Sequence, residues 1–159
     1  MKKMGTHLVV DAWQAPAELL NDPERIRSAL IEAIAAGEAT LIDICVHQFS
    51  PHGVTATVTL AESHIAIHTW PEYGYFAADL FFCGRGKPAV AMKVLQQALQ
   101  AGQVKIQEIE RGFSDDIDNA ILQGDSAYRL HRVAQETASQ ETLPNPAVNI
   151  KQRLEASLS

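Results

Sequence analysis

Residues 39–83 contain four short segments in which apolar and polar side chains alternate, and this pattern restricts the fold more than any other feature of the sequence. The segments are 39–49, 53–61, 64–70 and 75–83. Alternation with a period of two is typical of β-strands that bury one face. The connections are short and contain Pro51, Gly53 and the turn-forming run 71–74. Successive strands are therefore expected to pair in antiparallel hairpins.

Two other segments have the spacing of helices that bury one face. The segment 23–36 begins with Pro23, which favours the first turn of a helix, and 88–101 has apolar residues at similar intervals. Further strands are expected at 6–13 and 103–110. Helices next to an antiparallel sheet bury their apolar faces against it. The sequence thus predicts an α/β fold of the α+β type, a two-layer sandwich with a mainly antiparallel sheet and helices on one face.

The second face of the predicted sheet differs from a surface exposed to water. The apolar set of residues 41–49 that should face the helices is Ile42, Ile44 and Val46. The opposite faces of the strands carry mainly His, Thr, Cys and aromatic residues, whereas a solvated face would carry Lys and Glu. We therefore expect this face to pack against another surface, and a second copy of the chain would satisfy it in a two-fold dimer.

Length and charge exclude several classes of protein. The chain has 159 residues, a mass of 17.4 kDa and a net charge of −6, which fits one domain and gives no basic surface for nucleic acid. The apolar stretch before Asp11 is too short for a signal peptide, and no apolar run is long enough to span a membrane. Two cysteines do not make a disulfide framework. A soluble cytoplasmic protein is expected.

The composition changes after residue 113. Aspartate, glutamine and proline become frequent from Ser114 onward, and aliphatic residues become sparse. We expect 1–113 to form the compact domain and 114–159 to be a C-terminal extension that is mobile or loosely docked.

Clustered histidines raise the question of a metal site. His64 and His68 would bind one metal from a helix, but on a strand their Cα atoms lie roughly 13 Å apart. The sequence contains neither a CxxC nor an HExxH motif, so no metal is expected.

A Ser/His/Asp hydrolase built from Ser63, His68 and Asp79 is a second possible interpretation of these residues. The sequence lacks the GxSxG turn that would expose the nucleophile of such an enzyme.

Residues 62–84, ESHIAIHTWPEYGYFAADLFFCG, resemble the signature of the prokaryotic S-adenosylmethionine decarboxylases. These are small pyruvoyl-dependent enzymes of spermidine and polyamine biosynthesis. The run 49–63, the opening GTHLVVDAW at 5–13 and ERGF at 110–113 also have counterparts in that family. The resemblance covers residues 4–113.

The resemblance implies a proenzyme that cleaves itself between Glu62 and Ser63 into a β chain (1–62) and an α chain (63–159). The Ser63 hydroxyl would attack the Glu62 carbonyl and form an ester, and elimination followed by hydrolysis would leave a pyruvoyl group on the new N-terminus. This carbonyl forms a Schiff base with the substrate amine and accepts the electron pair released with carbon dioxide. The resemblance therefore implies a covalent pyruvoyl cofactor and neither pyridoxal phosphate nor a metal.

The family motif also implies roles for other residues. His68 matches the base of processing, Thr55 a second processing hydroxyl, and Cys83 the acid that protonates the former α-carbon of the substrate. Phe49 matches a residue that stacks on adenine. Glu72 matches a carboxylate that binds the ribose hydroxyls. Trp70 has the same strand parity as His68, which places it either in the lining of the site or in the packing of the interface.

The spacing of Ser63 and His68 predicts a site shared between two chains. They are five positions apart in the sequence, so their Cα atoms lie about 16 Å apart in an extended strand. One protomer would supply Ser63 and Cys83, and its partner the other residues of the site. The resemblance to the family points to the same homodimer.

We therefore predict an enzyme that decarboxylates S-adenosylmethionine. Two alternatives stay open at this stage. One is a pyruvoyl-dependent decarboxylase of arginine or another amino acid on the same scaffold, against which Phe49 and Glu72 argue. The other is a non-catalytic regulatory paralogue, which would have no need to retain Ser63, His68 and Cys83 together.

Overall fold

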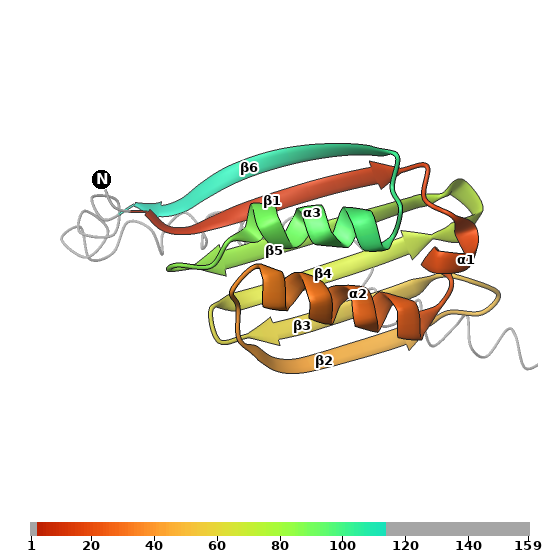
Figure 1. The fold of residues 1–159 in the computed structure, drawn as a ribbon, viewed down its shortest axis with the longest axis horizontal. Helices are drawn as coiled ribbons and strands as arrows, with labels where there is room; N and C mark the ends of the chain where they lie inside the picture. The colour runs from red at the N-terminus through yellow and green to blue at the C-terminus, as the bar shows by residue number, and fades with distance from the viewer. Residues whose placement is uncertain (1–2, 114–159) are drawn as a thin grey trace, which may run out of the picture. The chain divides into compact units, whose positions relative to one another are not determined.

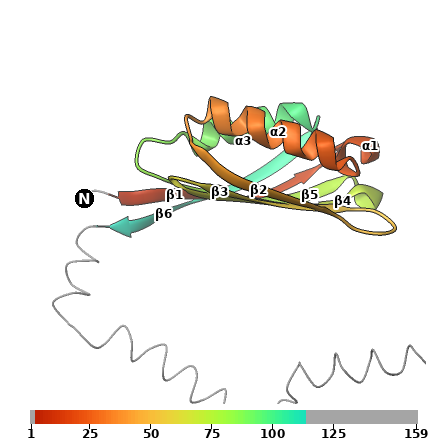
Figure 2. The same cartoon turned by 90° about the horizontal axis from the view of Figure 1, so that it is seen from below.

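The computed structural model describes residues 3–113, which form a six-stranded antiparallel sheet in the order β2-β3-β4-β5-β1-β6. The strands are β1 (Lys3–Trp13), β2 (Leu41–Gln48), β3 (Val54–Leu60), β4 (Ser63–Trp70), β5 (Tyr75–Cys83) and β6 (Gln103–Phe113). The helices are α1 (Ala17–Leu20), α2 (Pro23–Ala36), α3 (Pro88–Ala98) and the 3₁₀ turn η1 (Pro71–Tyr73). Figures 1 and 2 show α2 and α3 on one side of the sheet. The predicted two-layer fold is confirmed, while the extension predicted at 114–159 lies outside the described residues.

Helix α2 starts and ends where its sequence predicts. Its N-cap is Asp22, whose Oδ1 accepts hydrogen bonds from the next free backbone N–H groups, those of Glu24 at 2.9 Å and Arg25 at 3.1 Å. Pro23 occupies the first turn, where no backbone hydrogen bond is lost. The helix ends at Gly37, and a Cβ there would lie 2.9 Å from the Ala91 Cβ of α3. Glycine thus allows the two helices to pack closely.

The core lies between the helices and the sheet, and the alternation of the strands supplies it. In β3 and β5 every second side chain is buried, as predicted. Full burial of a large apolar side chain contributes about 1.5–3 kcal/mol to the free energy of unfolding. The largest fully buried side chains are Phe76, Phe82, Leu8, Leu20, Ile26, Leu30, Ile65, Ile67, Leu80, Met92, Leu95 and Leu99.

One predicted core residue is wrong. Ile42 was expected to face the helices with Ile44 and Val46, but it is 63% exposed. The register of β2 against β3 shifts between Leu41 and Asp43, and such an irregularity interrupts the alternation of side chains at this point. The other two residues pack at the edge of the core.

The opposite face of the sheet is free of helices within residues 3–113 (Figure 2). It carries a cluster in which the Arg111 guanidinium lies 4.7 Å from the ring centroid of Phe81. Beside it, His7 Nε2 lies 3.4 Å from Asp79 Oδ1 without hydrogen-bond geometry. We call this helix-free surface the open face. In this part of the chain, no helix is long and apolar enough to cross a membrane.

Candidate functional site

The β3–β4 hairpin places the Glu62–Ser63 bond at its tip. Leu60 and Ser63 are paired residues of the two strands, so Ala61 and Glu62 form the turn. Ser63 has a φ of +156°, a conformation that residues other than glycine rarely adopt. Strand alternation therefore does not fix the direction of its side chain. The Ser63 Oγ lies 3.3 Å from His64 Nδ1.

Glu62 is held from two neighbouring segments. Its backbone carbonyl accepts a hydrogen bond from the Cys83 N–H at 3.0 Å. Its carboxylate accepts two more from Thr40, from the backbone N–H at 2.8 Å and from the hydroxyl at 2.9 Å. The hydrogen bond from the Thr40 N–H is the main reason that the pKa of the Glu62 carboxyl is lowered from its usual value.

Cys83 ends β5 next to this hairpin. Its free thiol is half-buried, and the strand register places it on the open face together with Phe81. Gly5 of β1 is its cross-strand partner. A Cβ on Gly5 would lie 3.1 Å from the Cys83 Sγ and 2.8 Å from the Phe81 ring. The glycine thus leaves the space that the thiol occupies.

The other predicted residues meet at the opposite end of β4, around a pocket of about 310 Å³. His68 and Thr55 are cross-strand partners, and His68 Nδ1 lies 2.9 Å from the Thr55 hydroxyl. Half of the Phe49 side chain is exposed, so a flat ligand can reach its ring. The pocket is lined by Phe49, His52, Gly53, Thr55, His68, Thr69, Trp70 and Glu72. It thus collects all five residues that the sequence predicted for this part of the site.

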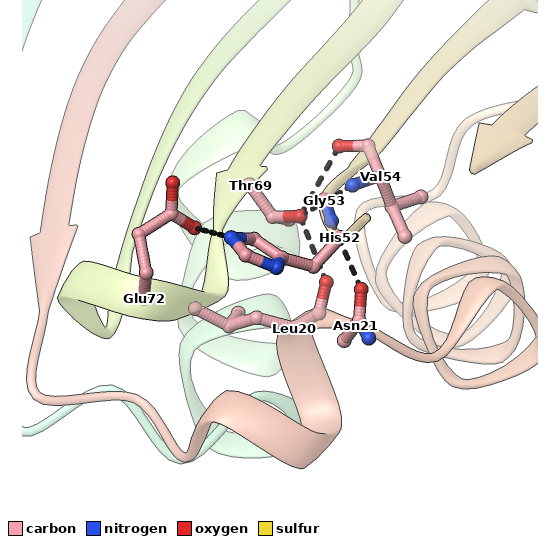
Figure 3. A network of polar contacts seen from close by, with 7 residues as sticks. All are labelled: Leu20, Asn21, His52, Gly53, Val54, Thr69 and Glu72. Carbon is pink, nitrogen blue, oxygen red and sulfur yellow. Dashed lines mark hydrogen bonds and ion pairs between the residues drawn. The ribbon is translucent and has the colours of Figure 1, made fainter. Parts of the chain in front are cut away.

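A buried polar network fixes the loop between β2 and β3 on this pocket (Figure 3). The Gly53 N–H donates to Asn21 Oδ1 at 2.9 Å. The Thr69 hydroxyl is buried, accepts a hydrogen bond from the Val54 N–H at 2.8 Å and donates to the Leu20 carbonyl at 2.8 Å. These contacts connect the end of α1 to the β3 and β4 strands. Neither α1 nor this network was predictable from the sequence pattern.

His52 lines the pocket as well, although the sequence predicted no role for it in the site. Its Nε2 lies 3.3 Å from Glu72 Oε2 (Figure 3). Both side chains also line a neighbouring hollow of about 330 Å³, together with Glu18 and Asn21. The position of His52 between Phe49 and the strand predicted at 53–61 was the sequence feature that could have indicated its place in the pocket. Among residues 3–113 no group of three or more His, Cys, Asp or Glu side chains is placed to hold a metal.

Trp70 stands in a row of aromatic rings. Its ring centroid lies 5.2 Å from that of Tyr75 and 6.4 Å from that of His68. The Tyr75 hydroxyl donates to Asp11 Oδ1 at 2.6 Å. Burial, and secondly this hydrogen bond, raise the pKa of Tyr75 to about 12, so the phenol is neutral at physiological pH and remains a donor.

The structure therefore divides the predicted residues into two groups at opposite ends of β4. Ser63 and Cys83 lie together at one end, whereas His68 and the pocket lie at the other. Ser63 and His68 are five positions apart along β4, which corresponds to about 16 Å between their Cα atoms in an extended strand. A single copy of the chain does not bring the two groups into contact.

Comparison with known proteins identifies the family. A family model described as S-adenosylmethionine decarboxylase matches residues 6–112. The S-adenosylmethionine decarboxylase proenzyme of Methanococcus maripaludis is 41% identical over 117 residues, which cover 73% of this chain and 96% of that protein. Its namesake from Thermotoga petrophila is 42% identical over 118 residues, 74% of this chain and 91% of that protein. These matches confirm the resemblance that residues 62–84 predicted.

A solved structure agrees with the sequence comparisons. The crystal structure of the adenosylmethionine decarboxylase from Aquifex aeolicus matches with a TM-score of 0.67 and 37% identity, and the match covers 71% of this chain and 94% of that one. The structural comparison and the sequence comparisons thus point to the same family. The chain belongs to the S-adenosylmethionine decarboxylase family.

Proposed function

We propose that this chain is a proenzyme that cleaves itself between Glu62 and Ser63 and then decarboxylates S-adenosylmethionine. The product, decarboxylated S-adenosylmethionine, is an aminopropyl donor for spermidine synthesis. The observation that carries the proposal is the position of this bond: it lies at a hairpin tip, in strained backbone, with its carbonyl already hydrogen-bonded to the Cys83 N–H. The identity of the substrate is inferred from membership of the family.

The geometry around Ser63 suits an internal rearrangement. The Ser63 Oγ attacks the Glu62 carbonyl carbon, a C–O bond forms, and the C–N bond breaks to leave an ester and a free amine. The Cys83 N–H stabilises the negative charge that develops on the carbonyl oxygen. Elimination then removes the α-proton of residue 63 and expels Glu62 as a carboxylate. Hydrolysis of the remaining enamine releases ammonia and leaves a pyruvoyl group.

The surroundings of residue 63 fit such a group, since the neighbouring strand end is anchored by a backbone hydrogen bond and carries a half-buried thiol. A pyruvoyl carbonyl accepts the electron pair left behind when the substrate loses carbon dioxide. The Cys83 thiol can return a proton to the former α-carbon from this side of the site. Its thiol is accessible from the open face, where Gly5 leaves room for it.

The pocket at the other end of β4 suits the nucleoside part of the substrate. Phe49 offers an exposed ring for stacking on adenine. Glu72 has two oxygens that accept hydrogen bonds from the vicinal hydroxyls of ribose. The electron-rich face of Trp70 attracts the sulfonium cation. These three residues line one pocket with His68, which supports a nucleoside substrate rather than arginine.

A homodimer that packs open face to open face would join the two half-sites. A two-fold axis that lies between the sheets and perpendicular to β4 places the Ser63 end of one copy over the pocket of the other. Stacked sheets lie about 10 Å apart, so side chains from both can meet. Each dimer then contains two complete sites, and in each of them His68 of one protomer serves as the processing base for Ser63 of its partner.

Substrate choice is tested by measuring carbon dioxide release from two labelled substrates. The purified, cleaved protein should release carbon dioxide from carboxyl-labelled S-adenosylmethionine and not from carboxyl-labelled arginine. Release from arginine alone would favour a sister decarboxylase on this scaffold. Release from neither by fully cleaved protein would favour a regulatory role.

Glu72→Gln should raise the KM for S-adenosylmethionine roughly tenfold, since it replaces a hydrogen bond to a charged acceptor by a weaker one, and leave kcat within about twofold. Glu18→Gln is the matched control, because Glu18 lines only the neighbouring hollow. Steady-state kinetics of the cleaved variants gives both constants. An unchanged KM for Glu72→Gln would remove this carboxylate from ribose binding.

Cys83→Ala should still be cleaved, at least in part, because the ester forms through Ser63 and the backbone N–H of residue 83 is kept. Its kcat for decarboxylation should fall by roughly 10²–10⁴, the usual contribution of a positioned general acid. Cys45→Ala is the control, since this thiol is exposed on β2. A cleaved Cys83→Ala enzyme with the turnover of the wild type would exclude the thiol as the proton donor.

A further inference from the structure

We propose that Thr40 is a positioning residue for the self-cleavage: it holds Glu62 so that the scissile carbonyl stays in reach of the Ser63 hydroxyl. This inference rests on the proposed cleavage between Glu62 and Ser63. Thr40 lies just before β2 and was not singled out by any sequence motif. It reaches the scissile turn only because β2 pairs with β3.

Thr40 contacts the turn through three separate groups. Its N–H and its hydroxyl donate to the two carboxylate oxygens of Glu62, at 2.8 and 2.9 Å. Its carbonyl accepts a hydrogen bond from the Ala61 N–H at 3.0 Å. Both residues of the two-residue turn are therefore bound to Thr40. We refer to these three hydrogen bonds as the Thr40 clamp.

The clamp acts next to the atoms that react. The Glu62 carbonyl is held from the other side by the Cys83 N–H at 3.0 Å, so β5 fixes its oxygen while the Thr40 clamp fixes its side chain. Attack by the Ser63 hydroxyl requires the carbonyl carbon to stay within a narrow range of distance and angle, and small displacements of reacting groups reduce rates strongly. Loss of the clamp would let the turn rotate away from this geometry.

The clamp also survives the reaction. None of its hydrogen bonds involves the C–N bond that breaks, so the end of the β chain stays attached after cleavage. Cleavage creates a new terminal carboxylate on Glu62, beside the existing side-chain carboxylate. The two donors of Thr40 compensate part of this added negative charge. The lowered pKa of the Glu62 carboxyl agrees with a group that binds these donors in its ionised form.

Thr40→Val tests the inference, because valine keeps the shape and the backbone N–H but lacks the hydroxyl donor. We expect cleavage of newly synthesised full-length chain to slow roughly tenfold, less than the ~10²-fold that a misplaced reacting group costs. Thr40→Ser should restore the wild-type rate. Intact mass spectrometry of samples taken over time gives the cleaved fraction. Glu38→Gln is the control for the same end of the molecule, since it removes the ion pair with Lys87 and should change nothing.

A coupling measurement separates positioning from a general loss of stability. Glu62→Leu should also slow cleavage, and Thr40→Val should add little to it in the double variant, because leucine already leaves the Thr40 hydroxyl without the acceptor that it has in the wild type. Additive effects, or Thr40→Val cleavage at the wild-type rate, would overturn the inference while the proposed cleavage stands. A wild-type chain that never cleaves would overturn both.

Discussion

Purified Ser63→Ala protein should consist of one uncleaved chain of 17.4 kDa, whereas wild-type protein should consist mainly of the fragments 1–62 and 63–159. Alanine keeps the backbone of the hairpin but lacks the oxygen that attacks the Glu62 carbonyl. Intact mass spectrometry distinguishes the two results. The wild-type α chain should also resist Edman sequencing, because a pyruvoyl group has no amine to react.

Ser28→Ala is the matched control for this experiment. Its hydroxyl donates to the Glu24 carbonyl at 2.9 Å on the exposed side of α2, away from the hairpin, so its removal should leave cleavage unaffected. A single unmodified chain from freshly prepared wild type, persisting after long incubation, would contradict the self-cleavage. Partial cleavage that increases with time would instead report its rate.

The strands and their inward residues were predictable because each depends on local sequence. Period-two alternation identified β3 and β5, and Pro23 with its following periodicity identified α2. A β-bulge breaks the relation between the position of a residue in the sequence and the face of the strand on which its side chain lies. Ile42 has the parity of a core residue, yet the register shift of β2 turns it to solvent, and no residue type in the segment signals the shift.

The two halves of the site were predictable to different degrees. The residues matching the family motif were found, and the structure groups Phe49, Thr55 and His68 around one pocket. The supporting contacts were missed, because each joins segments far apart in the sequence. Asn21 holds Gly53 across 32 positions, and Thr40 holds Glu62 across 22. Such pairs become visible only when the topology is known.

His64 is the residue that most directly competes with the shared-site proposal. Its Nδ1 lies 3.3 Å from the Ser63 Oγ within the same chain, slightly beyond the reach expected of a general base. If it served as the processing base, cleavage would need no partner. His68 is the better candidate for the processing base, because a hydrogen bond of 2.9 Å with the Thr55 hydroxyl fixes the orientation of its ring. His68→Ala expressed alone should therefore stay uncleaved, while His64→Ala should cleave.

Co-expression of Ser63→Ala with His68→Ala should restore cleavage that neither variant shows alone. In a mixed dimer with sites across the interface, one site combines an intact Ser63 with an intact His68, and the other site carries both lesions. Cleavage should appear only in the His68→Ala chain, because only that chain still contains the Ser63 hydroxyl that attacks the Glu62 carbonyl. Differently tagged chains and mass spectrometry identify which one is cut.

The fraction of chains cleaved after co-expression also has an upper limit, which distinguishes a site shared between two chains from a site within one chain. If the chains associate at random in equal amounts, half of the dimers are mixed, so cleavage should approach half of the His68→Ala chains and no Ser63→Ala chain. The dimer must form before cleavage, and its sheets are expected to pack through the open face. If both residues act within one chain, mixing restores nothing, since every chain carries its own defect. Absence of cleavage in demonstrated mixed dimers would therefore exclude the shared site and leave the decarboxylase reaction itself unaffected.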